Sequence, residues 1–375
     1  MIDRRWITNI PWGVVGLVSL ICLIGLSAVY SATYTAQGPS PLFYRQIAWM
    51  AVGMFLMFLM LIPDYHTIGR YTYGFYAVSI VLLLLVMVIG RTGMGAQRWL
   101  PLGPFAFQPS ELAKLALMLS LARYFADSKK RDICLTDLGV PAAMVLVPFL
   151  LVLKQPDLGT ALMLLLTAGI LTLVAGLRIR AVLIMLIIVS TAAATVFLIP
   201  PVKAKIWNSL KPYQQKRIKA FINPSADPLG SGYHTNQSKI AVGSGRTFGR
   251  GFRQGTQSQM AFLPERHTDF IFAVIAEERG IVGAGFLIAL YLALLLYGID
   301  AAKNAKDRLG GLIASGIVSM LSIYVFINIG MALGIAPVVG VPLPLASYGG
   351  TSVITTFLAI GLVLNIQMRR FMLFY

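Results

Sequence analysis

The sequence predicts an all-α membrane protein, a polytopic bundle of about ten transmembrane helices that forms one domain over residues 1–375. The first observation is composition: 57% of the 375 residues are hydrophobic and 12% are charged, with a mean hydropathy of +0.77. Soluble domains carry about 25% charged residues. The second is that apolar runs of roughly 20 residues recur, the length that a helix needs to cross a hydrocarbon core.

The apolar runs predict the elements in chain order. A short turn at 155–159 separates the fifth run from the sixth. The first run follows Arg4 and Arg5 without a small-residue cleavage pattern, which indicates a retained span and not a cleaved signal. The predicted spans are 12–31, 45–63, 73–90, 110–126, 139–154, 159–177, 181–200, 269–298, 310–333 and 351–368.

The distribution of Lys and Arg predicts the orientation. With a cytoplasmic N-terminus, most short basic segments fall on the inner side, as the positive-inside rule expects. An even number of spans then returns the C-terminus to the cytoplasm. The inner basic residues are Arg4, Arg5, Arg70, Lys129, Lys130, Arg131, Arg178, Arg180, Lys303, Lys306, Arg308, Arg369 and Arg370.

The large loop between the seventh and eighth spans, residues 201–268, falls outside and is strongly basic. It includes Lys239, Arg246 and Arg266, while Asp227 and Glu265 are its acidic residues. One interpretation is a solvated loop attracted to the anionic headgroups of membrane lipids. The other is a basin for a phosphate or pyrophosphate substrate, which the many glycines favour because they let backbone N–H groups approach an anion. No nucleotide-binding fingerprint is present.

Asp269 is the candidate catalytic residue. It lies in FLPERHTDFIFAVIAEERG, residues 262–280, at the mouth of the eighth span and directly after Arg266 and His267. A carboxylate at a membrane boundary is costly unless it is paired, solvated or used, so it predicts a functional site. The alternative is that Thr268 or Asp269 caps the helix. Further along, Glu277 and Glu278 are expected to face the bundle interior, against Arg279.

Other polar residues gather on the same outer side. In QPSELAK, residues 108–114, Ser110 is a candidate N-cap, and Glu111 and Lys114 are helix neighbours that favour a structural ion pair over direct catalysis. Asp157 in QPDLGT is a helix cap or a ligand or metal contact. The broken, proline-rich segment 334–350 predicts a re-entrant or cavity-lining stretch.

The histidines and cysteines show no metal-ligand spacing, so neither a structural zinc site nor a disulfide is expected. A divalent cation such as Mg²⁺ or Mn²⁺ could assist at Asp269 or Asp157, although no dedicated cage is visible.

Five segments together resemble the SEDS family of polytopic membrane proteins, and within it the RodA type. The segments are QPSELAK at 108–114, QPDLGT at 155–160, DPLGSGYHTNQSKIAVGSG at 227–245, GTQSQMAFLPERHTDFIFAVIAEERG at 255–280 and NIGMALGIAPVVGVPLPLASYGGTS at 328–352. The N-terminal third matches mainly in span layout and in Arg45. Arg246 departs from the family, whose members commonly have glycine at that position.

The resemblance implies a peptidoglycan glycosyltransferase for cell elongation in the bacterial inner membrane, with an extracytoplasmic active site. Its substrate would be lipid II, and its partners a class B penicillin-binding protein and the elongation machinery, with no nucleic acid. Asp269 matches the essential aspartate, and Glu111, Lys114 and Asp157 match recurrent polar positions. Expected substrate-binding residues are Arg45, Lys239, Arg246, Arg266, His267 and Ser347.

The residues predict a compatible reaction. Asp269 would act as general base on the acceptor 4-hydroxyl, which attacks the anomeric carbon with inversion, while Lys and Arg stabilise the departing pyrophosphate. Two alternatives remain. A flippase for the lipid-linked precursor would need polar groups along its whole path, whereas here they crowd the outer third. A scaffold that activates a partner enzyme would tolerate loss of Asp269.

Overall fold

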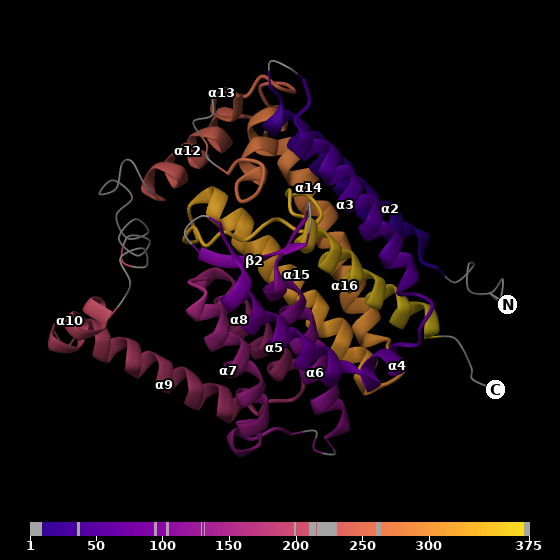
Figure 1. Ribbon diagram of the computed structural model, residues 1–375, viewed down its shortest axis with the longest axis vertical. Coiled ribbons are helices and arrows are strands. Elements are labelled where there is room, and N and C mark those ends of the chain that lie inside the picture. Colours follow the sequence, from indigo (N-terminus) through magenta and orange to yellow (C-terminus); the bar gives the residue numbers. More distant parts are fainter. Residues whose placement is uncertain are drawn as a thin grey trace.

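The computed structural model is a bundle of long helices (Figure 1). A helix coincides with each predicted span. These helices are α2 (Trp12–Thr33), α3 (Pro41–Leu59), α5 (Thr72–Ile89), α6 (Pro109–Asp127), α7 (Gly139–Lys154), α8 (Leu158–Val174), α9 (Ile179–Leu198), α14 (Ile271–Lys303), α15 (Arg308–Leu333) and α16 (Gly350–Arg369). The structure describes residues 10–35, 38–93, 96–102, 105–128, 130, 132–198, 200–209, 215, 231–259, 263 and 265–370.

Among the described residues, seven helices are long and apolar enough to cross a membrane by length and composition. The chain is therefore an integral membrane protein. Helix α8 has 17 residues and is shorter than this criterion requires. Helix α6 contains Glu111, Lys114, Arg123 and Asp127, which make it more polar than its neighbours. The count of ten crossings stays a prediction.

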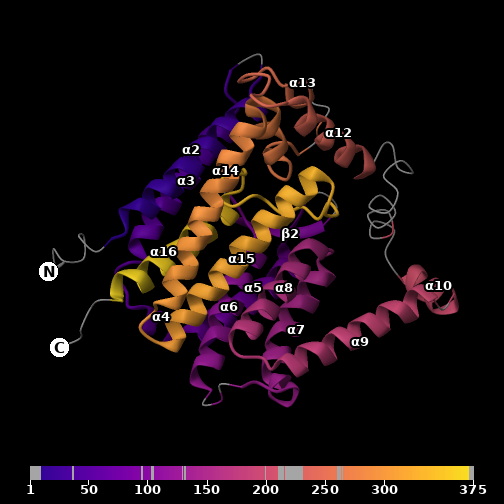
Figure 2. The same cartoon turned by 180° about the vertical axis from the view of Figure 1, so that it is seen from behind.

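The centre of the bundle is formed by α15 and α16. Of their most apolar 18-residue windows, 72% and 78% of the residues are buried, against 22% in α3 and in α5. Figures 1 and 2 show α15 crossing between the N-terminal helices α2 and α3 on one side and α5 to α8 on the other. Helix α15 therefore connects the two halves, and a polar residue on it can reach either one.

Helix α9 departs from the bundle and leads into α10 (Pro200–Ser209), as both views show. Its apolar side chains are largely exposed, with Ile179 at 69% and Ile187 at 61%. Such a helix is stable in a membrane because lipid tails cover its apolar surface.

Shorter elements occupy the connections. They are α4 (Tyr65–Arg70), the 3₁₀ turn η1 (Leu135–Leu138), α12 (Ser231–Ser244) and α13 (Thr256–Gln259). The stretch before α6, which lies between two predicted spans, forms a three-stranded antiparallel sheet. Its strands, in the order β1-β2-β3, are β1 (Arg91–Gly93), β2 (Ala96–Leu102) and β3 (Phe105–Phe107). The described parts of 201–268 are largely helical, whereas Asp227 lies outside the described residues.

The segment between α15 and α16 is irregular and buried, as predicted. Leu343, Leu345 and Ala346 are each at most 1% exposed. A Cβ on Gly25 of α2 would lie 2.4 Å from the Ala346 Cα, so glycine there permits the close approach. Non-helical backbone of this kind is tolerated at membrane depth only inside protein or along a cavity.

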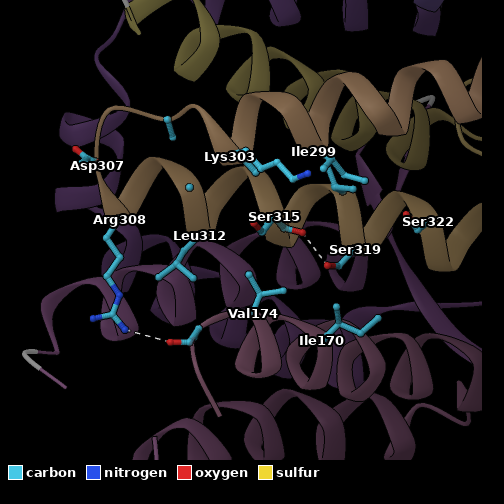
Figure 3. A pocket seen from close by; sticks show the side chains of 15 residues that line it. Ile170, Val174, Ile299, Lys303, Asp307, Arg308, Leu312, Ser315, Ser319 and Ser322 are labelled. Carbon is cyan, nitrogen blue, oxygen red and sulfur yellow. Dashed lines mark hydrogen bonds between the residues drawn. The ribbon is translucent and has the colours of Figure 1, made fainter. Parts of the chain in front are cut away.

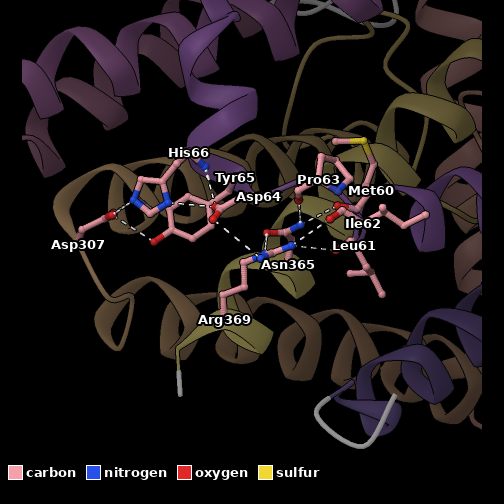
Figure 4. Close-up of polar contacts among 11 residues, drawn as sticks. Met60, Leu61, Ile62, Pro63, Asp64, Tyr65, His66, Asp307, Asn365 and Arg369 are labelled. Carbon is pink, nitrogen blue, oxygen red and sulfur yellow. Dashed lines mark hydrogen bonds and ion pairs between the residues drawn. The ribbon is translucent and has the colours of Figure 1, made fainter. Parts of the chain in front are cut away.

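At the end of the bundle where α15 begins and α16 ends, a polar cluster joins α4, α15 and α16 (Figure 4). His66 lies between Asp64, at 3.0 Å, and Asp307. The buried Asn365 amide donates to the carbonyls of Met60 and Pro63 at 2.7 and 2.6 Å. This cluster fixes the turn between α3 and α4 against α16.

Candidate active site

Asp269 lies in a turn that comes directly before α14. Glu265 has a φ of +50°, and its carbonyl accepts hydrogen bonds of 3.1 Å from the N–H groups of Thr268 and Asp269. Helix α14 begins at Ile271, and no side chain caps it. The alternative that Thr268 or Asp269 serves as a helix cap is therefore wrong, and capping does not account for the partly exposed Asp269 carboxylate.

Asn328 of α15 fixes the main chain of Asp269. Its amide donates to the carbonyls of Asp269, at 2.9 Å, and of Val341, at 2.7 Å. Gly340, which directly precedes Val341, has a φ of +75°. A Cβ at Gly340 would lie 3.4 Å from Asp269 Oδ2. The catalytic candidate thus faces the irregular segment before α16, with little side-chain bulk between.

Ser347 braces the same turn. Its hydroxyl donates to the Thr268 carbonyl at 2.6 Å and accepts from the Leu343 N–H at 2.8 Å. The Gln46 amide of α3 donates to the Ser347 carbonyl at 3.0 Å. The buried hydroxyl is engaged on both sides and braces this turn, and its contact with substrate stays a prediction.

Two basic residues of the predicted set, Arg266 and His267, come shortly before Asp269 in the chain. The Nη1 atom of Arg266 is buried and makes no hydrogen bond to the described residues, and burial lowers the pKa of this guanidinium. Burial also lowers the pKa of His267. Of the charged neighbours of this ring, Glu265 raises its pKa and Arg266 lowers it. The main chain of His267 accepts from the Tyr348 N–H at 2.9 Å. A buried cation with an unused donor is suited to bind an anion.

Lys239 and Arg45 lie at the same end of the bundle. Lys239, on α12, packs against Gly334 at the end of α15, where a Cβ would lie 1.9 Å from the Lys239 Cε atom. Ser238, its neighbour, donates to the Ala332 carbonyl at 2.8 Å. Arg45 is exposed in the first turn of α3, directly before the Gln46 that holds the Ser347 segment.

Arg246 is not brought to Asp269. Its φ is +48°, and its carbonyl accepts from the Ile281 N–H at 2.9 Å, twelve residues beyond Asp269. The side chain is exposed beside the kink at Gly280, where φ is +67°. The basic loop folds back along α14, so Arg246 lies beside residue 281 and not beside Asp269, and its contact with substrate stays a prediction.

Glu277 and Glu278 hold this loop in place. The Glu277 carboxylate accepts two hydrogen bonds, of 2.8 and 3.0 Å, and the Glu278 carboxylate accepts one of 3.2 Å. All three come from backbone N–H groups within residues 250–258. Arg279 instead donates to Ser27 at 2.5 Å. The expectation that the two glutamates face the interior is confirmed, whereas the hydrogen bond of Arg279 goes to Ser27 and not to either glutamate.

Glu111 and Lys114 form a buried ion pair with N–O distance 2.6 Å on α6. Tyr324 of α15 completes the group, since its hydroxyl contacts Lys114 and donates to Glu111 Oε2 at 3.1 Å. The predicted pair is present and sits at a helix interface. Ser110 does not cap α6, because the helix begins at Pro109 with Gln108 as its N-cap.

Asp157 caps α8, with Oδ1 accepting from the Thr160 N–H at 3.1 Å. Its other oxygen lies 3.4 Å from Arg98 of β2, whose guanidinium also donates to the Pro156 carbonyl at 2.5 Å. At Gly159, a Cβ would lie 2.3 Å from the Val339 carbonyl. The cap interpretation is confirmed, and Asp157 supports the segment that faces Asp269.

The donor set does not fit a dedicated metal centre. Among the described residues, no three side chains of His, Cys, Asp or Glu gather as ligands. The Asp157 carboxylate is already occupied by Arg98 and a backbone N–H.

Four residues that shape the site are not among the predicted ones: Gln46, Arg98, Tyr324 and Asn328. Gln46 and Asn328 are lone amides in apolar helices and are 0% exposed. A polar residue within a membrane span is expensive and marks function or buried contacts. That signal could have found both of these amides.

The comparisons with known proteins agree on one group. A family model for FtsW, RodA and SpoVE, described as cell cycle protein, matches residues 5–371. The peptidoglycan glycosyltransferase MrdB of Escherichia coli K12 is 42% identical over 371 residues, which cover 96% of each chain. A chain of a peptidoglycan synthase complex, solved to show how polymerization and crosslinking are coordinated, is 35% identical with a TM-score of 0.81, over 96% of this chain and 98% of that one. RodA of Thermus thermophilus is 33% identical with a TM-score of 0.69, over 97% and 98%.

Proposed function

Since the chain belongs to the FtsW, RodA and SpoVE family and is a peptidoglycan glycosyltransferase, we propose that Asp269 is the general base of its polymerase reaction. The observation that carries this is the placement of Asp269. Its carboxylate caps no helix, its main chain is held by Asn328, and it lies three residues after Arg266, whose buried Nη1 atom is an unused donor.

In the proposed reaction, Asp269 removes the proton from the 4-hydroxyl of the acceptor sugar. The oxygen attacks the anomeric carbon of the donor as the bond to the pyrophosphate breaks, which inverts the configuration. A positioned base contributes about 10²–10⁴-fold to the rate. The pyrophosphate carries the bonding electrons away, so no second carboxylate is needed as an acid.

The cations near Asp269 are suited to the leaving group. Arg266 offers its unused Nη1 donor, while Lys239 and Arg45 lie at the same end of the bundle. His267 adds a polar ring whose pKa is lowered mainly by burial. Charge-assisted hydrogen bonds from fixed donors stabilise developing negative charge strongly where water is excluded.

The fixed polar groups around the site have supporting roles in this proposal. Asn328 and Ser347 hold the turn that carries Asp269. Asp157 with Arg98 holds the start of α8 against Val339. The group of Glu111, Lys114 and Tyr324 locks α6 to α15 and keeps Asn328 in register.

The chain is a membrane protein that acts on a lipid-linked substrate together with a cell-wall synthase partner. We propose lipid II as the substrate and a class B penicillin-binding protein of the elongation machinery as the partner. The proposed location is the inner membrane, with both termini in the cytoplasm, the active site outside and residues 201–268 as an extracytoplasmic part of one membrane domain. The clustering of Lys and Arg supports this orientation.

The test is Asp269→Asn in purified protein with its transpeptidase partner, assayed for glycan strands from lipid II. Asn keeps the shape of the side chain but cannot accept the proton, so polymerisation should fall by about 10²–10⁴-fold. The same change at the exposed Asp300 is the matched control and should leave the rate unchanged.

Lipid II binding and thermal stability should persist in Asp269→Asn, because the main-chain contacts of residue 269 remain. A folded Asn variant that still polymerises lipid II within a few fold of wild type would show that Asp269 is not the base. A variant that loses lipid II binding but keeps the rate at saturation would assign Asp269 to binding alone.

A further inference from the structure

A cavity of about 750 Å³ opens between the ends of three helices, far from Asp269 along each of them (Figure 3). Its walls come from the last turns of α8 and α14 and the first turns of α15. Asp269, in contrast, lies just before the start of α14 and contacts Asn328 near the end of α15. The cavity is therefore separate from the catalytic site.

Two cations line this cavity, Lys303 and Arg308. Arg308 donates to the carbonyls of Ser128, Lys130 and Ala175 at 2.9, 3.1 and 3.2 Å. Within the described part of the chain, no carboxylate lies within ion-pair distance of either cation. Carbonyl oxygens orient a guanidinium but do not neutralise it, so net positive charge remains at the cavity.

The acidic residue of the cavity is directed elsewhere. Asp307 accepts from the Gly310 N–H at 2.7 Å as the cap of α15. The other carboxylate oxygen contacts the Tyr65 hydroxyl at 3.1 Å and the ring of His66, both on α4. Figure 3 shows the Asp307 side chain apart from Lys303 and directed away from the Arg308 guanidinium. The cavity therefore offers positive charge to a ligand.

The remaining wall changes from polar to apolar. Ser315 and Ser319 present hydroxyls on α15, with Ser319 bonded to the Ser315 carbonyl at 2.7 Å. Ile170 and Val174 of α8 are 36% and 52% exposed, and Ile299 of α14 is 38% exposed. A ligand with a charged head, polar linkages and a hydrocarbon chain matches this order of groups.

We propose that the cavity binds one anionic phospholipid from the leaflet on the predicted cytoplasmic side. Its phosphate lies at Lys303 and Arg308, its ester region along the serines of α15, and one acyl chain against Ile170 and Val174. Basic pockets between membrane helices on the cytoplasmic side favour anionic headgroups. A soluble phosphate compound would leave the apolar wall unused.

The test compares lipids retained by the full-length protein from nanodiscs of phosphatidylcholine with or without phosphatidylglycerol, counted by native mass spectrometry. Wild type should retain phosphatidylglycerol selectively. Lys303→Gln should bind it about fivefold more weakly, since one interfacial cation is worth about that factor. Ser315→Leu, which replaces a hydroxyl of the polar wall with a bulky apolar side chain, should also weaken retention. Lys306→Gln removes the same charge three residues further along, outside the cavity, and should match wild type.

Competition with inorganic phosphate distinguishes a bound phospholipid from a bound free phosphate. Inorganic phosphate at a concentration comparable to that of the lipid should not displace the lipid. Equal retention by wild type and Lys303→Gln would overturn the proposal. An equal loss in Lys306→Gln would also overturn it, because it would indicate diffuse surface attraction. Displacement by inorganic phosphate would assign the cavity to a free anion. Lys303→Gln alters an exposed side chain, so the test stands even if Ser315→Leu fails to fold.

Discussion

The amide of Asn328 donates to the main-chain carbonyl of Asp269 at 2.9 Å and ties the start of α14 to the middle of the bundle. Asn328 is fully buried, and the same nitrogen holds Val341 at 2.7 Å. It is a positioning residue, since it acts on the catalytic candidate through the backbone. Misplacement of a reacting group by about 1 Å can cost roughly 10²-fold in rate.

We therefore expect Asn328→Ala to lower kcat for glycan polymerisation by more than tenfold, with little change in KM for lipid II. Leaving two carbonyls unpaired should also cost about 1–3 kcal/mol each in unfolding free energy. The measurement is steady-state polymerisation together with thermal unfolding in detergent.

Asn365→Ala provides the matched control. Asn365 is equally buried and also donates to two carbonyls, at 2.7 and 2.6 Å, but at the other end of the bundle. It should lose similar stability and keep its kcat. If both variants lose kcat in parallel, the effect of Asn328 is general destabilisation and not positioning.

The second prediction concerns the Glu111 and Lys114 pair on α6. Both side chains are at most 7% exposed, and Tyr324 joins them from α15. Removing one partner of a buried pair costs about 3–5 kcal/mol because it strands a charge. Glu111→Ala and Lys114→Ala should each lower thermal stability strongly, and the charge-swapped double variant should recover part of it.

The exposed pair of Arg123 and Asp127 on the same helix is the comparison, with a distance of 2.7 Å. Asp127→Ala should cost no more than about 1 kcal/mol. A Glu111→Ala protein as stable as wild type but inactive would move Glu111 from the structural to the catalytic residues.

Local sequence patterns predicted the features that depend on residues close together in the chain. Apolar length placed the helices, three-residue spacing placed Glu111 beside Lys114, and the turn before α8 predicted the Asp157 cap. Contacts between distant segments were not predictable in this way. Tyr324 reaches Lys114 across 210 residues, and the folding of the basic loop along α14 carries Arg246 away from Asp269.

The orientation of the bundle gives the third prediction. In a protein whose Cys22 and Cys134 are replaced by alanine, single cysteines at Ser128 and Ser225 should react with a membrane-impermeant thiol reagent from opposite sides. Ser128 follows α6 on the predicted inner side, and Ser225 lies outside the described residues, in the predicted outer loop. Labelling of both from the same side would contradict the proposed topology.

The last prediction is a pH dependence that arises from His267. Burial is the main cause that lowers its pKa below the usual 6.5, so the folded state binds this proton less readily than the unfolded state. Stability therefore rises with pH between the lowered pKa and about 6.5, and it is lost as the pH falls through that window. His267→Gln removes the titrating group, so its unfolding temperature should decline less than that of wild type between about pH 7 and pH 5. The difference between the two profiles isolates His267, because every other titrating group is common to both proteins. Parallel profiles would show that the ring has the same affinity for protons in the folded and unfolded states.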